Sequence, residues 1–437
     1  MEAAVLIIFA AALIACVAAD ISVLYAMIAG YILFFAYGLI KKHSVRDMLR
    51  MSLKGMDTVK NILVVFLLIG VLTATWRSSG TIPMIICSAA GIVRPAFLLP
   101  AVFLINCLVS LLIGTSFGTA ATVGTICMAI GRTAGISPTL LGGAILAGAF
   151  FGDRCSPMST SAHLVCELTG TDIYDNIRNM LRSAVLPFLI SCALYAAIGM
   201  SYKNAQFSTE ALEILRSGFT MHWILLVPAA LIIIMSLCRI NIRWVMLTSI
   251  VVSAALSIVI QDVSIRDMVS FMITGYHAPT RELAAILDGG GLVSMVTVSL
   301  IVLISASYSG IFDGTGMIDG LKARTAAIAG RASSFAATFA AAVLAAIISS
   351  NQTLAIIMTK QLCSDNYRNK PELALDIEDT AVVMSPLVPW SIASAVPLSV
   401  VGAPAGAVTA AFYLYLLPLI RLLRTLMSKN HDPMSKK

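Results

Sequence analysis

Two polar stretches, each built around a Ser-Pro step, lie inside a chain that is otherwise almost entirely apolar. They cover residues 151–163 (FGDRCSPMSTSAH) and residues 378–391 (EDTAVVMSPLVPWS). Charges and hydroxyls are costly in hydrocarbon, and proline frees backbone groups that no water satisfies there. A carboxyl group in such a place can hold a proton or a metal cation in turn. The two stretches are therefore the first candidates for an ion site.

The composition identifies the surroundings of these stretches as a membrane. The chain has 437 residues, of which 59% are hydrophobic and 12% charged, and its mean hydropathy is +0.93. Apolar runs of about 17 to 20 residues recur along it, long enough to cross a hydrocarbon core. We therefore expect an all-α polytopic membrane protein whose partner is the lipid bilayer. The first run, residues 3–19, lacks a basic segment before it and is interpreted as a retained helix.

The charge and the cysteines point to no further class of partner. The net charge of +7 comes from Lys and Arg grouped in particular loops, which is the positive-inside pattern and needs no nucleic acid. The nine cysteines are scattered without a CxxC pair, so we interpret them as small buried hydrophobes. No disulfide framework, resident metal or cofactor is expected.

A five-residue motif occurs twice at equivalent places. Residues 44–48 (SVRDM) recur as residues 264–268 (SIRDM), each after a pair of apolar spans, and the Ser-Pro steps follow in the same order. Residues 41–60 hold six basic against two acidic residues, whereas residues 261–290 hold two against four. Because basic loops stay cytoplasmic, the two copies should face opposite sides. This pattern predicts inverted-topology repeats of transporter type, a chance match being the alternative.

The repeat gives a domain plan. We expect a first transmembrane repeat over residues 1–200 and an inverted second repeat over residues 222–426, with broken helices and re-entrant hairpins at the polar stretches. Residues 201–221 should form an amphipathic helix on the outer membrane surface. Residues 427–437 should be a cytoplasmic tail, so that both termini are cytoplasmic.

Two further segments interrupt the apolar pattern. Residues 114–125 (GTSFGTAATVGT) crowd glycines and hydroxyls, which predicts unwound backbone that lines a cavity or, alternatively, close helix packing. Residues 349–353 (SSNQT) occupy the corresponding place in the second half. A half-helix starting there would point its positive dipole end at the membrane centre. Asn351 and Gln352 are then expected to contact a ligand or ion, the alternative being hydrogen bonds between helices.

Residues 114–118 also match the GxSxG pattern of serine hydrolases. Ser116 would then be a nucleophile, and His163 is the nearest candidate base in the sequence. The pattern arises freely where glycine and serine are common, so an intramembrane hydrolase is only the remote alternative. We expect a protein that is not an enzyme.

Acidic residues in the two Ser-Pro stretches are the candidates for charge coupling. Asp153 precedes Arg154, and Glu378 precedes Asp379. A carboxylate at the bilayer centre costs about 2.5–3.5 kcal/mol, so it is usually paired, protonated or functional. We predict that Asp153 and Glu378 couple charge, with a sodium ion near Asp153 and Ser156. A structural salt bridge is the alternative, and it is favoured more for Asp379.

As a set, these motifs resemble the NhaC family of bacterial sodium/proton antiporters over essentially the whole chain. The residues that carry the resemblance are 114–131, 147–163, 168–180 (LTGTDIYDNIRNM), 351–352 and 377–390. The resemblance implies a multi-pass secondary transporter of the bacterial cytoplasmic membrane, a homodimer with an elevator-like motion. It also implies exchange of sodium, or another monovalent cation, for protons by alternating access. Some family members instead move organic anions such as malate and lactate.

Three positions depart from the family pattern. After Ser-Pro the family usually has S-D-T-T-N, whereas this chain has STSAH, with Thr160 in place of the acid and His163 in place of the amide. Asn351 stands where an acid is common. Two cation-binding carboxylates are thus neutral, which leaves room for a small organic substrate such as an amino acid or a carboxylate. Because imidazole titrates near neutral pH, His163 is a candidate replacement proton carrier.

The predicted midplane site has two sides. The first repeat supplies Thr115, Ser116, Thr119, Ser156, Ser159, Thr160 and His163, and the second supplies Asn351, Gln352, Thr353, Ser385, Trp390 and Ser391, with Asp153 and Glu378 as the charged members.

Overall fold

The structure is a computed structural model that describes most of the chain. The described residues are 4–5, 8–9, 11–12, 15–16, 23–57, 59–90, 94–203, 209–238, 240–316, 333–349 and 351–429. Most of the span expected over residues 3–19, Ser350 and residues 430–437 of the expected tail lie outside them. Within the described residues the secondary structure is helical apart from an isolated bridge between Tyr276 and Gly289.

The first half forms helices over the apolar runs that the sequence marks. Both α6 and α9 begin with a proline, which the first turn tolerates because its N–H groups have no intrahelical partner. The elements are α2 (Val23–Ile40), α3 (Val45–Asp57), α4 (Lys60–Ser78), α5 (Thr81–Ala90), α6 (Pro95–Ile113), α7 (Ser116–Thr119), the π-helical η1 (Ala120–Gly124), α8 (Thr125–Thr133), α9 (Pro138–Cys155), α10 (Thr160–Thr169) and α11 (Ile173–Met200).

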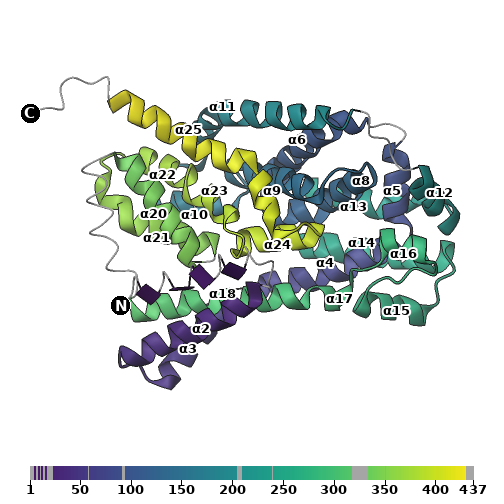
Figure 1. Ribbon diagram of the computed structural model, residues 1–437, viewed down its shortest axis with the longest axis horizontal. Coiled ribbons are helices and arrows are strands. Elements are labelled where there is room, and N and C mark those ends of the chain that lie inside the picture. Colours follow the sequence, from purple (N-terminus) through teal and green to yellow (C-terminus); the bar gives the residue numbers. More distant parts are fainter. Residues whose placement is uncertain are drawn as a thin grey trace, which may run out of the picture.

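The second half continues the helical pattern with more breaks (Figure 1). The elements are α12 (Thr209–Gly218), η2 (Trp223–Leu226), α13 (Val227–Leu237), α14 (Ile242–Ile260), α15 (Ile265–Thr274), α16 (Arg281–Leu287), α17 (Gly291–Ser294), α18 (Val296–Thr315), α20 (Ser334–Ser349), α21 (Gln352–Cys363), η4 (Ser364–Asn366), α22 (Lys370–Glu378), α23 (Ala381–Met384), η5 (Ser385–Leu387), α24 (Ile392–Val401), η6 (Ala405–Ala410) and α25 (Phe412–Lys429).

Several helices are long and apolar enough to cross a membrane. Within the described residues these are Pro95–Ile113, Ile173–Met200 and Arg243–Ile260. Three further apolar pairs are bent at a short break: Leu63–Ser78 with Thr81–Ser88 by 67°, Leu212–Gly218 with Trp223–Met235 by 108°, and Lys370–Leu387 with Ile392–Val401 by 53°. The predicted all-α polytopic membrane fold with broken helices is confirmed.

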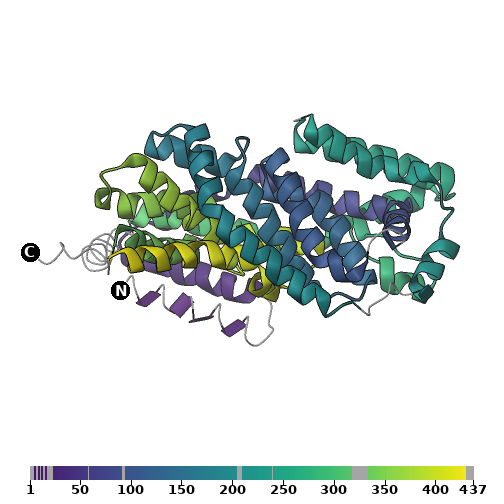
Figure 2. The same ribbon diagram turned by 90° about the horizontal axis from the view of Figure 1, so that it is seen from above.

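The two ends of the bundle are formed by different parts of the chain. In Figure 1, α3 and the C-terminal end of α25 lie towards one end, whereas α12, α15 and α16 lie towards the other. Figure 2 shows the same arrangement from above, with the teal helices from the middle of the chain at one end. The two helices that carry the repeated motif are therefore at opposite ends of the bundle.

Both copies of the repeated motif start a helix in the same way. Ser44 Oγ accepts a hydrogen bond from the Asp47 N–H at 3.1 Å and donates to its carboxylate at 2.6 Å. Ser264 and Asp267 repeat this arrangement at 3.1 and 2.7 Å. Such reciprocal capping satisfies N–H groups that a helix start leaves free. The packing is reciprocal too, since α3 lies along α18 and α15 lies along α4.

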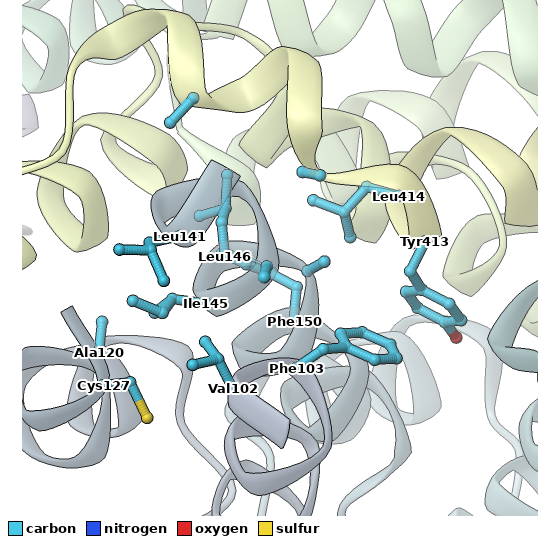
Figure 3. Close-up of a cluster of buried hydrophobic side chains, with 14 of the residues drawn as sticks. Val102, Phe103, Ala120, Cys127, Leu141, Ile145, Leu146, Phe150, Tyr413 and Leu414 are labelled. Carbon is cyan, nitrogen blue, oxygen red and sulfur yellow. The ribbon is translucent and has the colours of Figure 1, made fainter. Parts of the chain in front are cut away.

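The core is centred on α9, the helix that ends in the first Ser-Pro stretch. Figure 3 shows its side chains, among them Ile145 and Phe150, packed against α6, η1, α8 and α25. Glycine lets the backbones approach closely, because a Cβ on Gly152 would lie 2.3 Å from the Leu111 nitrogen of α6. Asp153 is therefore held by one of the most enclosed helices of the fold.

A second close approach joins the two halves. Where α3 crosses α18, a Cβ on Gly55 would lie 2.1 Å from the Ala306 carbonyl oxygen, and a Cβ on Gly310 would lie 1.9 Å from that of Met51. These obstacles are backbone atoms, which cannot move aside as a flexible side chain does.

Replacing Gly310 with alanine should therefore force α3 and α18 apart. We expect the Gly310→Ala variant to lose about 1–3 kcal/mol of stability, as overpacking does. Thermal unfolding of the purified protein in detergent measures this as a lower melting temperature. Gly406→Ala is the matched control, because nothing lies within 4 Å of a Cβ at that position. Equal melting temperatures for the two variants would contradict this account of the crossing.

Candidate ion-binding site

Four helices begin at residues that the sequence singled out. In the first half, Thr115 Oγ1 caps α7 by accepting from the Gly118 N–H at 3.0 Å, and Ser159 Oγ caps α10 by accepting from Ala162 at 3.2 Å. In the second half, Asn351 Oδ1 caps α21 by accepting from the Thr353 N–H at 2.9 Å. Ser391 Oγ caps α24 by accepting from the Ala393 N–H at 3.3 Å. A helix that begins at residues 349–353 was thus correctly predicted. Such starts carry partial positive charge.

The prediction of unwound backbone over residues 114–125 is wrong for most of that segment. Only Gly114, with φ of +78°, and the extended Thr115 leave helical geometry, and the chain then continues through α7, η1 and α8. The hydroxyls of Thr119 and Thr122 donate to carbonyls four residues earlier, at 2.9 and 2.7 Å. The threonines therefore satisfy helical backbone instead of replacing it, and the helix widens locally into a π-turn.

Asp153 lies where three of these broken segments meet. Its side chain is buried, at 4% exposure. Ser116 Oγ donates to Oδ2 at 3.4 Å, and Ser159 Oγ donates to Oδ1 at 3.3 Å. The side-chain amide of Gln352, from the second half, lies near this carboxylate, and its Nε2 donates to the Val382 carbonyl at 3.1 Å. Carboxylate, hydroxyl and amide oxygens are the ligands that hard cations prefer. The arrangement is therefore suited to a small cation.

Arg154 does not pair with Asp153, although the two are adjacent. Consecutive helical residues point about 100° apart, and the fully buried Arg154 guanidinium turns instead to the Asp379 carboxylate, with which it forms an ion pair. It also donates to Ser183 Oγ at 2.8 Å and to Tyr413 Oη at 3.2 Å. The salt-bridge alternative thus holds for Asp379, and the Asp153–Arg154 pair that adjacency suggested does not form.

A second ion pair extends this network, and sequence reasoning missed it. Arg421 Nη2 lies 2.6 Å from Asp376 Oδ1, and Arg421 Nε lies 3.5 Å from Asp379 Oδ2. Tyr367 Oη donates to the other Asp376 oxygen at 2.7 Å. The missed signal is the spacing of Asp376 and Asp379, which puts two acids on one helical face.

Glu378 is the least satisfied charged group of the site. It is fully buried, and within the described residues neither carboxylate oxygen has a hydrogen-bond partner. Arg154 Nε donates to its backbone carbonyl at 3.2 Å, and the charges of Asp153 and Asp379 act on its side chain. A buried acceptor without a partner is costly. Glu378 is accordingly a group that can take up a proton.

Other predicted site residues in the described part of the chain form hydrogen bonds to the backbone and not to Asp153. Ser156 accepts from the Met158 N–H, Ser385 donates to the Ala381 carbonyl, and Trp390 donates to that of Ile347. These bonds satisfy backbone groups at the helix breaks. The side chains of Thr160, His163 and Thr353 are exposed.

The geometry also bears on the hydrolase alternative. Ser116 donates to Asp153, whereas His163 Nε2 lies 2.9 Å from the Pro157 carbonyl oxygen. No hydrogen bond joins Ser116 to His163, both of which are described, so the serine–base contact of a hydrolase is not formed. Across the described part of the chain, no three His, Cys, Asp or Glu residues gather into a metal-ligating group either.

An all-α membrane fold with broken helices around a buried, oxygen-lined carboxylate defines a polytopic membrane transporter. The chain belongs to the Na⁺/H⁺ antiporter family, whose sequence pattern matches residues 1–167 and 148–422.

The chain is similar to several characterised transporters along most of its length. It is 28% identical to the Na⁺/H⁺ antiporter NhaC of Alkalihalophilus pseudofirmus, over 82% of this chain and 79% of that protein. It is 25% identical to the malate-2H⁺/Na⁺-lactate antiporter of Bacillus subtilis, over 85% and 82%. It is also 25% identical to the arginine/ornithine antiporter ArcD of Halobacterium salinarum, over 80% and 74%.

Replacing Arg154 tests how much its buried ion pair with Asp379 stabilises the fold. We expect Arg154→Met to lose about 3–5 kcal/mol of stability, because it leaves the buried Asp379 carboxylate without its main partner. The double variant Arg154→Met with Asp379→Leu should recover part of this loss, since no unpaired charge remains. Thermal unfolding of the three proteins in detergent measures both effects. A double variant less stable than Arg154→Met alone would refute the explanation.

Proposed function

We propose that this protein exchanges sodium, or another monovalent cation, for protons across the bacterial cytoplasmic membrane by alternating access. The observation that carries the proposal is the buried Asp153 carboxylate, which accepts hydrogen bonds from Ser116 and Ser159 and lies near Gln352. Among the described residues, no cationic side chain forms an ion pair with it. Family membership supports the same exchange.

The proposed coupling is electrostatic. Asp153 binds either sodium or a proton, since a carboxylate that holds one has no free charge for the other. Glu378 lies within electrostatic reach of Asp153, and two buried carboxylates disfavour being charged together. The charge on Glu378 therefore controls whether Asp153 holds a sodium ion or a proton. A sodium ion bound near Asp153 would leave in place the hydrogen bond that Ser156 Oγ accepts from the Met158 N–H at the helix break.

The proposed architecture is a pair of inverted repeats, residues 1–200 and 222–426, with a linker at residues 201–221. The identical capping of α3 and α15, their positions at opposite ends of the bundle and their reciprocal packing support it. The helix α12 occupies part of the linker, and residues 204–208 lie outside the described part of the chain. With the basic loop at residues 41–60 inside, both termini are cytoplasmic. A homodimer with elevator-like motion completes the proposal.

Asp153→Asn should abolish cation-driven exchange, because an amide neither binds a proton nor carries the charge that holds sodium. Everted vesicles that contain the unmodified protein should dequench a pH-gradient dye when sodium is added, and those with Asp153→Asn should not. Asp57→Asn is the control, since Asp57 is an exposed acid in a surface ion pair with Lys60. If no alkali cation dequenches the dye with unmodified protein, cation/proton exchange is excluded.

A second candidate is the exchange of a small organic substrate, such as an amino acid or a carboxylate. The specific observation is that Thr160 and His163 of α10 and Thr353 of α21 are exposed hydrogen-bonding residues in the first turns of two helices. Helix starts of this kind suit a carboxylate group. The relatives named for malate, lactate, arginine and ornithine support such a substrate.

The second candidate predicts counterflow of a labelled substrate in proteoliposomes. Labelled malate, lactate, arginine and ornithine should be tested in turn against the same unlabelled compound. If His163 carries the proton, His163→Ala should flatten the pH dependence of counterflow between about pH 5 and 8, where imidazole titrates. His222→Ala, at an exposed histidine that caps η2, is the control. Absence of counterflow for every compound would leave cation exchange as the sole candidate.

A further inference from the structure

Two cavities flank Arg421 near the C-terminal end of the bundle. Each has a volume of about 300 Å³, and both are lined by Arg421 and Thr425 of α25. The first also reaches Arg424 and Ser183, and the second reaches Asp376 and Glu372 of α22. Asp376 lines the second cavity but is only 1% exposed, so its carboxyl group is almost covered.

Three acids on one short segment lead inward from this cavity. Asp376 lines the cavity and pairs with Arg421, which also approaches Asp379. Asp379 pairs with the buried Arg154, and Glu378 is the next residue along the chain. The series runs from a carboxyl group at the cavity wall to one that is fully buried.

The inner members of the series have unfilled hydrogen-bonding capacity. Among the described residues, Asp379 Oδ2 and both Glu378 carboxylate oxygens are buried without a hydrogen-bond partner. Buried acceptors in folded proteins are nearly always paired with protein or water. These oxygens are therefore places where a proton or a water molecule is stabilised.

We propose that these acids form a proton access route, running from the cavity at Arg421 through Asp376 and Asp379 to Glu378, and separate from the path taken by sodium. The proposal rests on the proposed cation/proton exchange and adds the entrance through which the proton arrives. In the proposed orientation this entrance is cytoplasmic.

The burial of the acids, and not the charge of the cavity, selects a proton over a metal cation. Glu372, Asp376 and Arg421 line the second cavity, but Asp376 is only 1% exposed, so a sodium ion has no open path past it. A proton needs no space of its own: Asp376 takes it from cavity water, passes it to Asp379 and returns to the carboxylate, and Asp379 passes it to Glu378 in the same way. Arg421 keeps its own protons, because a guanidinium is not deprotonated in proteins.

Charged and titratable groups of the neighbouring helices face the three acids, among them Tyr413 near Asp379 and Cys155 and Cys166 near Glu378. Asp376 faces Tyr367 and Arg421, with Glu372 in the same cavity. Asp379 faces Arg154 and Arg421, and Glu378 faces Arg154 and Asp153. The two arginines favour the charged forms of Asp376 and Asp379, so both acids return to the carboxylate once a proton has been passed on.

The test compares two reactions of the same protein in proteoliposomes. Proton-coupled sodium uptake needs the route, whereas exchange of labelled for unlabelled sodium across the membrane needs only the cation site. We expect Asp376→Asn to reduce proton-coupled uptake by about tenfold or more with little change in sodium/sodium exchange, and Asp376→Glu to restore uptake. Equal losses in both reactions, or no loss in either, would overturn the route. Failure of the unmodified protein in both reactions would instead contradict the proposed function.

A second variant keeps the proposal testable if Asp376→Asn does not fold. Thr425→Cys places a thiol in both cavities, and a positively charged thiol reagent should then slow proton-coupled uptake several-fold while leaving sodium/sodium exchange unchanged. Reduction of the mixed disulfide should reverse the effect. Thr425→Ser, treated identically, corrects for the nine native cysteines. Equal inhibition of the two reactions, or none, overturns the separate proton entrance.

Discussion

The buried guanidinium of Arg154 sets the arrangement around it, because a full charge inside a membrane protein must be matched by partners that water cannot supply. Its partners come from α9 itself, α11, α22, α25 and the turn after α22, so the charge ties together segments more than two hundred residues apart. The same contacts fix the segment that holds Glu378, whose carbonyl oxygen Arg154 also binds. Because Arg154 pairs with Asp379, Asp153 has no counter-ion among the described residues. Its carboxylate is therefore suited to bind an ion.

Helix breaks at the site are stable because each is capped by its own polar residues. Thr115, Ser159, Asn351 and Ser391 each accept from an N–H of the helix they start. This local satisfaction lets the backbone bend in an apolar setting without a bound ligand. The hydroxyls and amides that look like a binding surface in the sequence thus divide into two groups. Most cap or brace the backbone, whereas in the described part of the chain Ser116 and Ser159 donate to the Asp153 carboxylate and Gln352 lies near it.

Sequence reasoning succeeds where the cause is local and fails where it is not. The apolar spans, the breaks at Gly114 and at the Ser-Pro step of residues 156–157, and the start of α21 all follow from residue types within one turn. The two copies of the repeated motif form the same helix cap, because Ser and Asp stand three residues apart in each. Adjacency misleads at Arg154, since helical geometry sends neighbours in different directions. The pairing of Asp376 with Arg421 depends on how α22 and α25 pack, which no local pattern encodes.

The contact between Gln352 and Asp153 has a consequence for motion. Asp153 sits on α9, which the glycine contact at Gly152 fastens to α6, whereas Gln352 opens a helix of the other half. In the proposed exchange, the groups around a bound sodium ion would therefore come from both halves of the chain. A sodium ion that draws these groups inward would draw the two halves together, and its release would let them separate.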